Sequence, residues 1–195
     1  MNIKQHYCRP FRARMDKQNS GFSPKTVIMR HNLEQTLIDK ITDTPTLATR
    51  IQAWKAEGKK IVFTNGVFDL LHLGHITYMA KAAELGDKLV IGLNADASVK
   101  RLKGDSRPLN DQSTRAALLA ALFFVDGIVL FEEDTPRDLI VTLMPDILVK
   151  GADYTIENIA GAKEVLANGG EVKTISLVEG YSSTSIINKI RGQIA

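Results

Sequence analysis

The chain alternates short apolar segments with segments of helical periodicity from residue 59 onward, and this alternation constrains the fold more than any other feature. The apolar segments predict strands at 60–64, 89–93, 127–131, 146–149 and 172–177. Strands joined by helices form parallel sheets with right-handed crossovers. Continuous apolar runs are typical of strands that helices cover on both faces. We therefore predict an α/β, Rossmann-like fold with a parallel five-stranded sheet, helices on both faces and additional N-terminal helices.

Three regions are expected along the chain. Residues 1–30 show no sustained periodicity and are expected to be a poorly ordered basic extension. Residues 31–58 show helical spacing of apolar residues, which we extend through Ile41. Residues 59–195 form the main domain.

Charge and cysteine content exclude several protein classes. Residues 1–30 carry seven basic residues and one acidic residue, a net charge of +6, whereas the remainder carries 18 basic and 21 acidic residues, a net charge of −3. The main body therefore predicts no nucleic-acid partner. The basic extension could contact nucleic acid or anionic lipid, although we favour a mobile terminus.

A single cysteine, Cys8, fits the reducing cytoplasm, and no apolar run is long enough to span a membrane.

The polar residues that follow the first predicted strand are the strongest site signal. Ligands of open parallel sheets bind beyond the carboxyl ends of the strands. Asn65-Gly66 predicts a turn there, and His72 and His75 lie three residues apart at the start of the next helix. Free backbone N–H groups and the helix dipole at such a start favour phosphate. A structural histidine pair is the alternative, and no metal site is expected because no convincing third ligand is nearby.

Three further segments follow predicted strands. The stretch 100–108 carries four basic residues, Lys100, Arg101, Lys103 and Arg107, which we assign to a polar loop over 101–110. Such cations would neutralise a triphosphate, although a solvated surface loop is the alternative. Hydroxyl residues at 182–185 precede the last helix and predict a second phosphate site or a simple helix cap. The segment 150–154 could read a base or a sugar, or be a plain loop.

Motifs of other nucleotide-binding and hydrolytic folds are missing from the sequence. There is no P-loop, no Gly-x-Gly-x-x-Gly after the first predicted strand and no Gly-x-Ser-x-Gly. Phosphoryl or nucleotidyl transfer therefore fits the remaining signals better than dehydrogenase or hydrolase chemistry.

The segments 64–75 and 179–185 resemble the two signatures of the cytidylyltransferase-like nucleotidyltransferases, the first containing their His-x-Gly-His element. Within that superfamily the chain is most similar to the bacterial heptose 1-phosphate adenylyltransferases. That similarity rests on the stretches 94–108, 131–136, 145–154 and 159–172.

The resemblance implies roles for individual residues. His72 and His75 would hold the nucleotide phosphates in the transition state, and Lys103 would contact the β- and γ-phosphates or the sugar phosphate. Leu177 stands where some members have an arginine, a cation that Arg107 is expected to replace. The expected nucleotide-binding set is Thr64, Asn65, Gly66, Phe68, Asn94, Ala95, Asp96, Arg107, Lys150, Gly151, Asp153, Ser182, Ser183 and Thr184.

The implied reaction moves AMP from ATP to heptose 1-phosphate and yields ADP-heptose and pyrophosphate, for lipopolysaccharide or other surface glycan precursors. Mg²⁺ would accompany ATP, and the resemblance also implies a homodimer and a separate sugar kinase upstream. One alternative is cytidylyl or adenylyl transfer to another phosphorylated small molecule, such as glycerol 3-phosphate. A second alternative is a nucleotide-binding module without catalysis.

Overall fold

The computed structural model describes residues 32–152, 155–176, 178 and 180–192. The strands are β1 (Ile41–Thr42), β2 (Ile61–Gly66), β3 (Lys88–Asn94), β4 (Gly127–Phe131), β5 (Ile147–Gly151) and β6 (Glu171–Ile175). The helices are α2 (Leu33–Ile38), α3 (Thr44–Ala56), α4 (Leu73–Ala83), α5 (Asp96–Lys103), α6 (Gln112–Ala120), α7 (Arg137–Leu143), α8 (Ala162–Ala167) and α9 (Ser183–Ile190), with a 3₁₀ turn at Ile156–Asn158.

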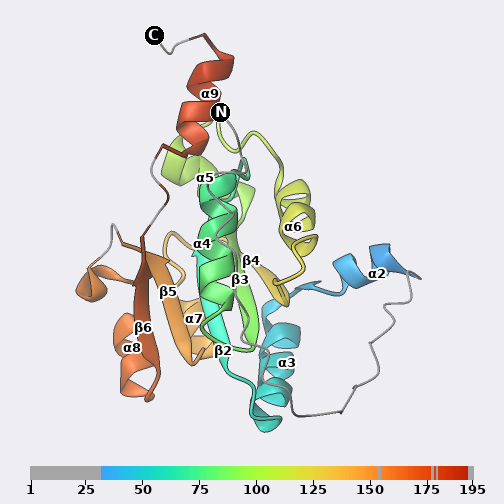
Figure 1. Cartoon of the computed structure of the whole chain (residues 1–195), viewed down its shortest axis with the longest axis vertical. Helices are drawn as coiled ribbons and strands as arrows, with labels where there is room; N and C mark the ends of the chain where they lie inside the picture. Colours follow the sequence, from blue (N-terminus) through green and yellow to red (C-terminus); the bar gives the residue numbers. More distant parts are fainter. Residues whose placement is uncertain (1–31, 153–154, 177, 179, 193–195) are drawn as a thin grey trace, which may run out of the picture. The chain divides into compact units, whose positions relative to one another are not determined.

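The strands form one parallel sheet in the order β1-β4-β3-β2-β5-β6. Figure 1 shows α8 beside β6 at one edge of the sheet, α2 and α3 toward the other edge, and α9 beyond the ends of the strands. Strand β2 pairs with β3 on one side and with β5 on the other, so the strand order along the chain changes direction at β2. This reversal is the switch point at which such sheets open a crevice for ligands.

Alternate side chains of each strand enter two separate cores. Val62 and Ile91 belong to the core under α4 and α6, whereas Phe63 and Val90 belong to the core under α3, α7 and α8. All four are fully buried. Burial of both faces is the reason why the strands read as continuous apolar runs. The predicted parallel α/β architecture with helices on both faces is confirmed.

The predicted number of strands is wrong, because the sheet has six strands rather than five. Residues 41–42, which we assigned to a helix, form β1 and pair parallel with β4, with Ile41 opposite Ile128. The backbone N–H of Ile128 donates to the Lys40 carbonyl (2.7 Å). Lys40 also donates its ammonium to the Ala120 carbonyl (2.9 Å), so contacts with residues some 80 positions away override the local helical pattern.

The predicted loop over 101–110 is also partly wrong. Helix α5 continues to Lys103 and ends at Gly104, whose φ of 88° lies in the region that favours glycine. Ser98 and Val99 are fully buried and hold the helix against the domain. Three of the four basic residues, Lys100, Arg101 and Lys103, therefore occupy its last turn, where cations stabilise the negative end of the helix dipole.

Candidate functional site

The carboxyl ends of β2, β3 and β5 open into a cavity of about 670 Å³. The start of α4, the end of α5 and the start of α9 complete its walls. The cavity brings together predicted residues that are far apart in the sequence: Asn65, Gly66, Phe68, His72, His75, Asn94, Lys103, Arg107, Lys150, Gly151, Ser182, Ser183 and Thr184.

His72 and His75 form a stacked pair at the amino end of α4. Their ring centroids lie 3.8 Å apart with an interplanar angle of 18°. His72 is the N-cap of the helix, and its Nδ1 accepts a hydrogen bond from the backbone N–H of His75 (3.3 Å). A neutral His72 ring must then carry its proton on Nε2. This ring therefore presents a donor on a wall of the cavity.

Both imidazoles are held in the neutral form. Burial, and to a smaller extent the neighbouring His72, lower the pKa of His75 to about 4. Burial also lowers the pKa of His72. Nδ1 of His75 is buried and has no hydrogen-bond partner within the described residues. Neutral rings still donate hydrogen bonds, and an anion placed against them would raise both pKa values.

Three cations line the cavity, and they differ in the protein groups that they already contact. Lys103 forms no ion pair within the described part of the chain, so its charge is available to a ligand. Arg107 is paired with the fully buried Asp69 (Nε to Oδ2, 2.6 Å). Lys150 donates to the side-chain oxygen of Asn65 across the gap between β5 and β2. Of the three, Lys103 is the cation best able to meet a triphosphate.

Asp69 is a site residue that our sequence analysis missed. Its carboxylate accepts hydrogen bonds from the backbone N–H of Leu109 (2.8 Å), the backbone N–H of Asn110 (2.9 Å) and the guanidinium of Arg107. Burial opposes ionisation of Asp69, but these donors together lower its pKa. The only signal in the sequence is a carboxylate inside the apolar run 67–71.

The hydroxyl residues of α9 divide between two tasks. Ser182 caps the helix, since its Oγ accepts a hydrogen bond from the backbone N–H of Ser185 (3.0 Å). Ser183 donates its hydroxyl to the Leu70 carbonyl (3.1 Å) and so ties α9 to the turn before α4. Thr184 lines the cavity, and its hydroxyl has no protein partner in the described part of the chain. The cap and the phosphate-site interpretations of this segment are therefore compatible.

Gly74 lines the cavity and also permits a close approach of other parts of the protein. A Cβ at this position would lie 3.1 Å from the His72 ring and 3.2 Å from Cβ of Tyr181. The absence of a side chain at Gly74 lets the segment before α9 pack onto the start of α4.

Several expected binding residues do not line this cavity. Thr64 is fully buried, and its hydroxyl is bonded to that of Tyr78 (2.8 Å), so it joins β2 to α4. Ala95 lies on a different cavity, and Asp96 is paired with Arg115 (2.7 Å). Asp153 lies outside the described residues.

Comparison with known proteins places this geometry in a family. The cytidylyltransferase-like family model matches residues 63–189. The chain belongs to the cytidylyltransferase-like family. This confirms the resemblance carried by residues 64–75 and 179–185, and with it the nucleotidyltransferase class.

Individual members of the family are similar over most of this chain. The bifunctional protein HldE of Geobacter metallireducens is 53% identical over 172 residues, which are 88% of this chain and 35% of the relative. HldE of Mesorhizobium japonicum is 54% identical over 153 residues, 78% of this chain and 31% of the relative. The chain thus spans about a third of the length of the curated relatives it matches.

Two crystal structures share the fold. The lipopolysaccharide core biosynthesis protein of Thermoplasma volcanium is 33% identical with a TM-score of 0.51, and the match covers 64% of this chain and all of that one. A pantoate–β-alanine ligase of Francisella tularensis is 16% identical with a TM-score of 0.51, and the match covers 78% of this chain and 77% of that one. The second likeness concerns the fold alone.

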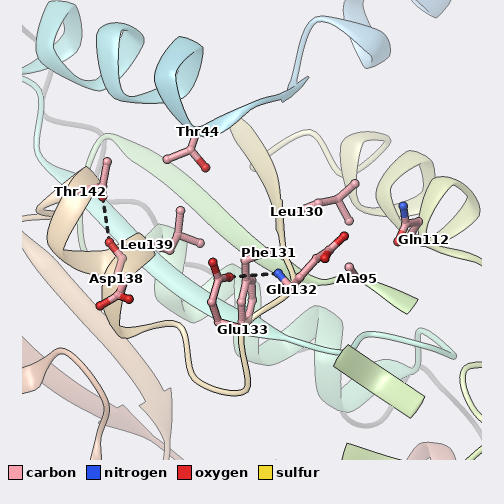
Figure 2. Close-up of a pocket in the computed structure, with 10 residues that line it drawn as sticks. All are labelled: Thr44, Ala95, Gln112, Leu130, Phe131, Glu132, Glu133, Asp138, Leu139 and Thr142. Atoms are coloured by element: carbon pink, nitrogen blue, oxygen red, sulfur yellow. Dashed lines mark hydrogen bonds between the residues drawn. The ribbon is translucent and has the colours of Figure 1, made fainter. Parts of the chain in front are cut away.

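This cytidylyltransferase-like chain has another cavity, of about 470 Å³, beyond the carboxyl end of β4. Figure 2 shows the carboxylates of Glu132, Glu133 and Asp138 around it, together with Thr44 and Gln112. The Glu133 carboxylate accepts a hydrogen bond from the backbone N–H of Glu132 (3.0 Å). Among the described residues, no lysine, arginine or histidine lines this cavity, so this part of the chain offers it none of the cations that bind phosphate.

The described residues offer no cage for a metal ion. Nowhere in the ranges given above do three or more His, Cys, Asp or Glu side chains lie close enough together to hold one. None of the described helices is long and apolar enough to cross a membrane.

Proposed function

We propose that this chain transfers AMP from ATP to heptose 1-phosphate, with release of pyrophosphate and formation of ADP-heptose. The observation that carries the proposal is the cavity at the switch point, where two neutral imidazoles at the start of α4 face an unpaired lysine of α5 and the hydroxyl-bearing start of α9. The sugar substrate rests on the similarity to HldE proteins and to a lipopolysaccharide core biosynthesis protein.

In the proposed reaction, a phosphate oxygen of the sugar 1-phosphate attacks the α-phosphorus of ATP in line. The bond from that phosphorus to the bridging β-phosphate oxygen breaks, and pyrophosphate carries away the electron pair. A phosphate monoester at neutral pH needs no strong base, so positioning and electrostatic stabilisation supply the catalysis. The neutral state of both imidazoles fits donors better than general acids.

The catalytic residues proposed are His72, His75 and Lys103. The Nε2–H of His72 would donate to a non-bridging oxygen of the α-phosphate, where negative charge accumulates. Lys103 would neutralise the β- and γ-phosphates as pyrophosphate leaves. Thr184 and the free N–H groups at the start of α9 would hold another phosphate.

Mg²⁺ is proposed to enter with the nucleotide as part of the substrate. Mg²⁺ is commonly held by substrate phosphates and one or two carboxylates rather than by a protein cage. The described residues fit this mode, because the exposed carboxylate of Asp134, which also pairs with Arg101, lines the cavity. The ion would supply charge neutralisation of the leaving pyrophosphate.

We also propose a homodimer, a cytoplasmic location and a separate sugar kinase that forms the 1-phosphate. These proposals rest on the family resemblance and, for the compartment, on the single cysteine.

The test is an assay of pyrophosphate release with purified protein and Mg²⁺. ATP and CTP are each offered with heptose 1-phosphate, glucose 1-phosphate and glycerol 3-phosphate. We expect turnover with ATP and heptose 1-phosphate and little with the other pairs. Preference for CTP or for glycerol 3-phosphate would support the alternative transferase and overturn the proposed substrate pair. Binding of ATP without turnover on any acceptor would favour a non-catalytic module.

A further inference from the structure

Arg115 is a charged residue of α6 whose side chain is completely buried. Its three guanidinium nitrogens all donate hydrogen bonds. Nε donates to the Asn110 carbonyl (3.1 Å) and Nη1 to the Val67 carbonyl (2.7 Å). Nη2 donates to the Asn94 carbonyl (2.8 Å) and to the Asp96 carboxylate (2.7 Å). The Arg115 side chain therefore joins three backbone carbonyls and one carboxylate, each from a different residue.

Each of these partners belongs to a segment that carries a wall of the nucleotide cavity. Val67 follows β2 in the turn that leads to the imidazole pair, and Asn94 ends β3. Asp96 begins α5, whose opposite end bears Lys103. Asn110 lies three residues beyond Arg107. Arg115 itself does not line the cavity.

The contacts of Arg115 continue into the buried carboxylate described above. Asn110 donates its backbone N–H to the Asp69 carboxylate (2.9 Å) and its side-chain amide to the Asp69 carbonyl (2.8 Å). Asp69 in turn pairs with Arg107. Hydrogen bonds thus run without interruption from Asp96 through Arg115, Asn110 and Asp69 to Arg107.

We propose that Arg115 is a positioning residue, which fixes the distances of Lys103 and Arg107 from the imidazole pair through this network. The proposal rests on the proposed function for the reaction that these groups serve. A buried ion pair is weak evidence of a contribution to stability, because an apolar side chain of similar size often serves as well. A fork of donors that reaches three different loops has instead a geometric task, which a lysine cannot perform with its single nitrogen.

The experiment compares Arg115→Lys and Arg115→Met with the wild-type chain. Lys55→Met is the matched control, since Lys55 is a partly buried cation that donates to the Met144 carbonyl (2.7 Å) and pairs with Asp146 (3.1 Å) just before β5, away from the cavity. Four quantities are measured for each protein: the melting temperature, the Kd of ATP by calorimetry, and kcat and KM with heptose 1-phosphate.

We expect both Arg115 variants to lose about 100-fold in kcat/KM, mainly in kcat, because displacements of about 1 Å in a positioned site have effects of this size. Lys55→Met is expected to lower the melting temperature without changing kcat/KM. Arg115→Lys retains the charge and most of the volume, so a merely structural role would be rescued by it. Failure of lysine to restore kcat is the distinctive result.

Wild-type kcat/KM and ATP affinity in Arg115→Lys would overturn the proposal, as would activity losses that follow the melting temperature equally in Lys55→Met. If both Arg115 variants fail to fold, Asp96→Asn removes only the ion pair at a partly exposed carboxylate and is expected to lower kcat about tenfold. Unchanged kcat in that variant would then overturn the proposal. If the heptose assay fails, the calorimetric Kd still tests the proposal without an acceptor: Arg115→Lys should weaken ATP binding, because Lys103 and Arg107 are displaced, and an unchanged Kd would overturn it.

Discussion

The two cavities at the carboxyl edge of the sheet differ in chemistry much more than in size. The cavity at the switch point has a volume of about 670 Å³, and the one beyond β4 about 470 Å³. The first collects two imidazoles, three cations and the amino ends of α4 and α9. The described residues that line the second include three carboxylates and no cation. Both are hollow, but only the first has groups that an anionic substrate requires.

The topology of the sheet explains this difference. At the switch point the loops after β2 and β5 diverge, which leaves room for two helix starts to face one cavity. Beyond β4 the neighbouring loops continue in one direction, and the residues that follow the strand are acidic. A depression in the surface therefore becomes a candidate nucleotide site only where the topology also directs donors into it.

The largest expected effect is a loss of turnover when an imidazole of the cavity at the switch point is removed. His75→Ala should fold but lose about 10²–10³ in turnover, because a donor to the transition state is removed. The measurement is kcat from pyrophosphate release, with circular dichroism as the check on folding. Turnover at the wild-type level in a folded variant would remove the imidazole pair from the mechanism.

The next effect compares two lysines of the same helical turn. Lys103 lines the cavity and Lys100 does not. Lys103→Met should weaken ATP binding about 10- to 100-fold, because a charge-assisted hydrogen bond to phosphate is lost. Lys100→Met is the control and should leave the Kd of ATP unchanged. Equal losses in both variants would indicate a general effect of charge rather than a specific contact.

A smaller effect concerns stability against pH. The pKa of His75 is lowered to about 4 in the folded chain, so between its ordinary value and that pH the unfolded chain binds the extra proton. Stability must then fall as the pH is lowered through this window, by on the order of 1 kcal/mol once solvent screening is allowed for. Urea unfolding at pH 7 and pH 5 measures it. His75→Gln should reduce the difference between the two pH values, whereas an unchanged difference would show that His75 is not its source.

The smallest effect is expected in the acidic cavity. Glu133→Gln preserves the shape of the side chain and removes one carboxylate from this cavity. Neither kcat nor the Kd of ATP should change, because none of the described residues that we propose as nucleotide contacts lines this cavity except Ala95. A clear change in ATP affinity would break the distinction between the two cavities and link them through the loop 132–136.

Local sequence patterns were sufficient for some features and insufficient for others. The strand at 127–131 was predicted with its observed bounds, and the helix starts that carry His72 and Ser182 were located from motif and spacing. The elements β1 and α5 were not predicted, because Ile41 is held in a strand by β4 and α5 is held by the burial of Ser98 and Val99. Each of these contacts joins residues that no local window contains.

The sequence by itself determined the parallel α/β architecture, the family and most of the residues that we had predicted at the cavity. Apolar periodicity and short motifs encode these features, because they depend on neighbours a few positions apart. Only the tertiary structure decided which cations remain free and which buried groups hold the walls. Asp69 meets its partners about 40 positions along the chain, and Arg115 meets Val67 from 48 positions away. The balance between burial and such distant hydrogen bonds exists only after the chain has folded.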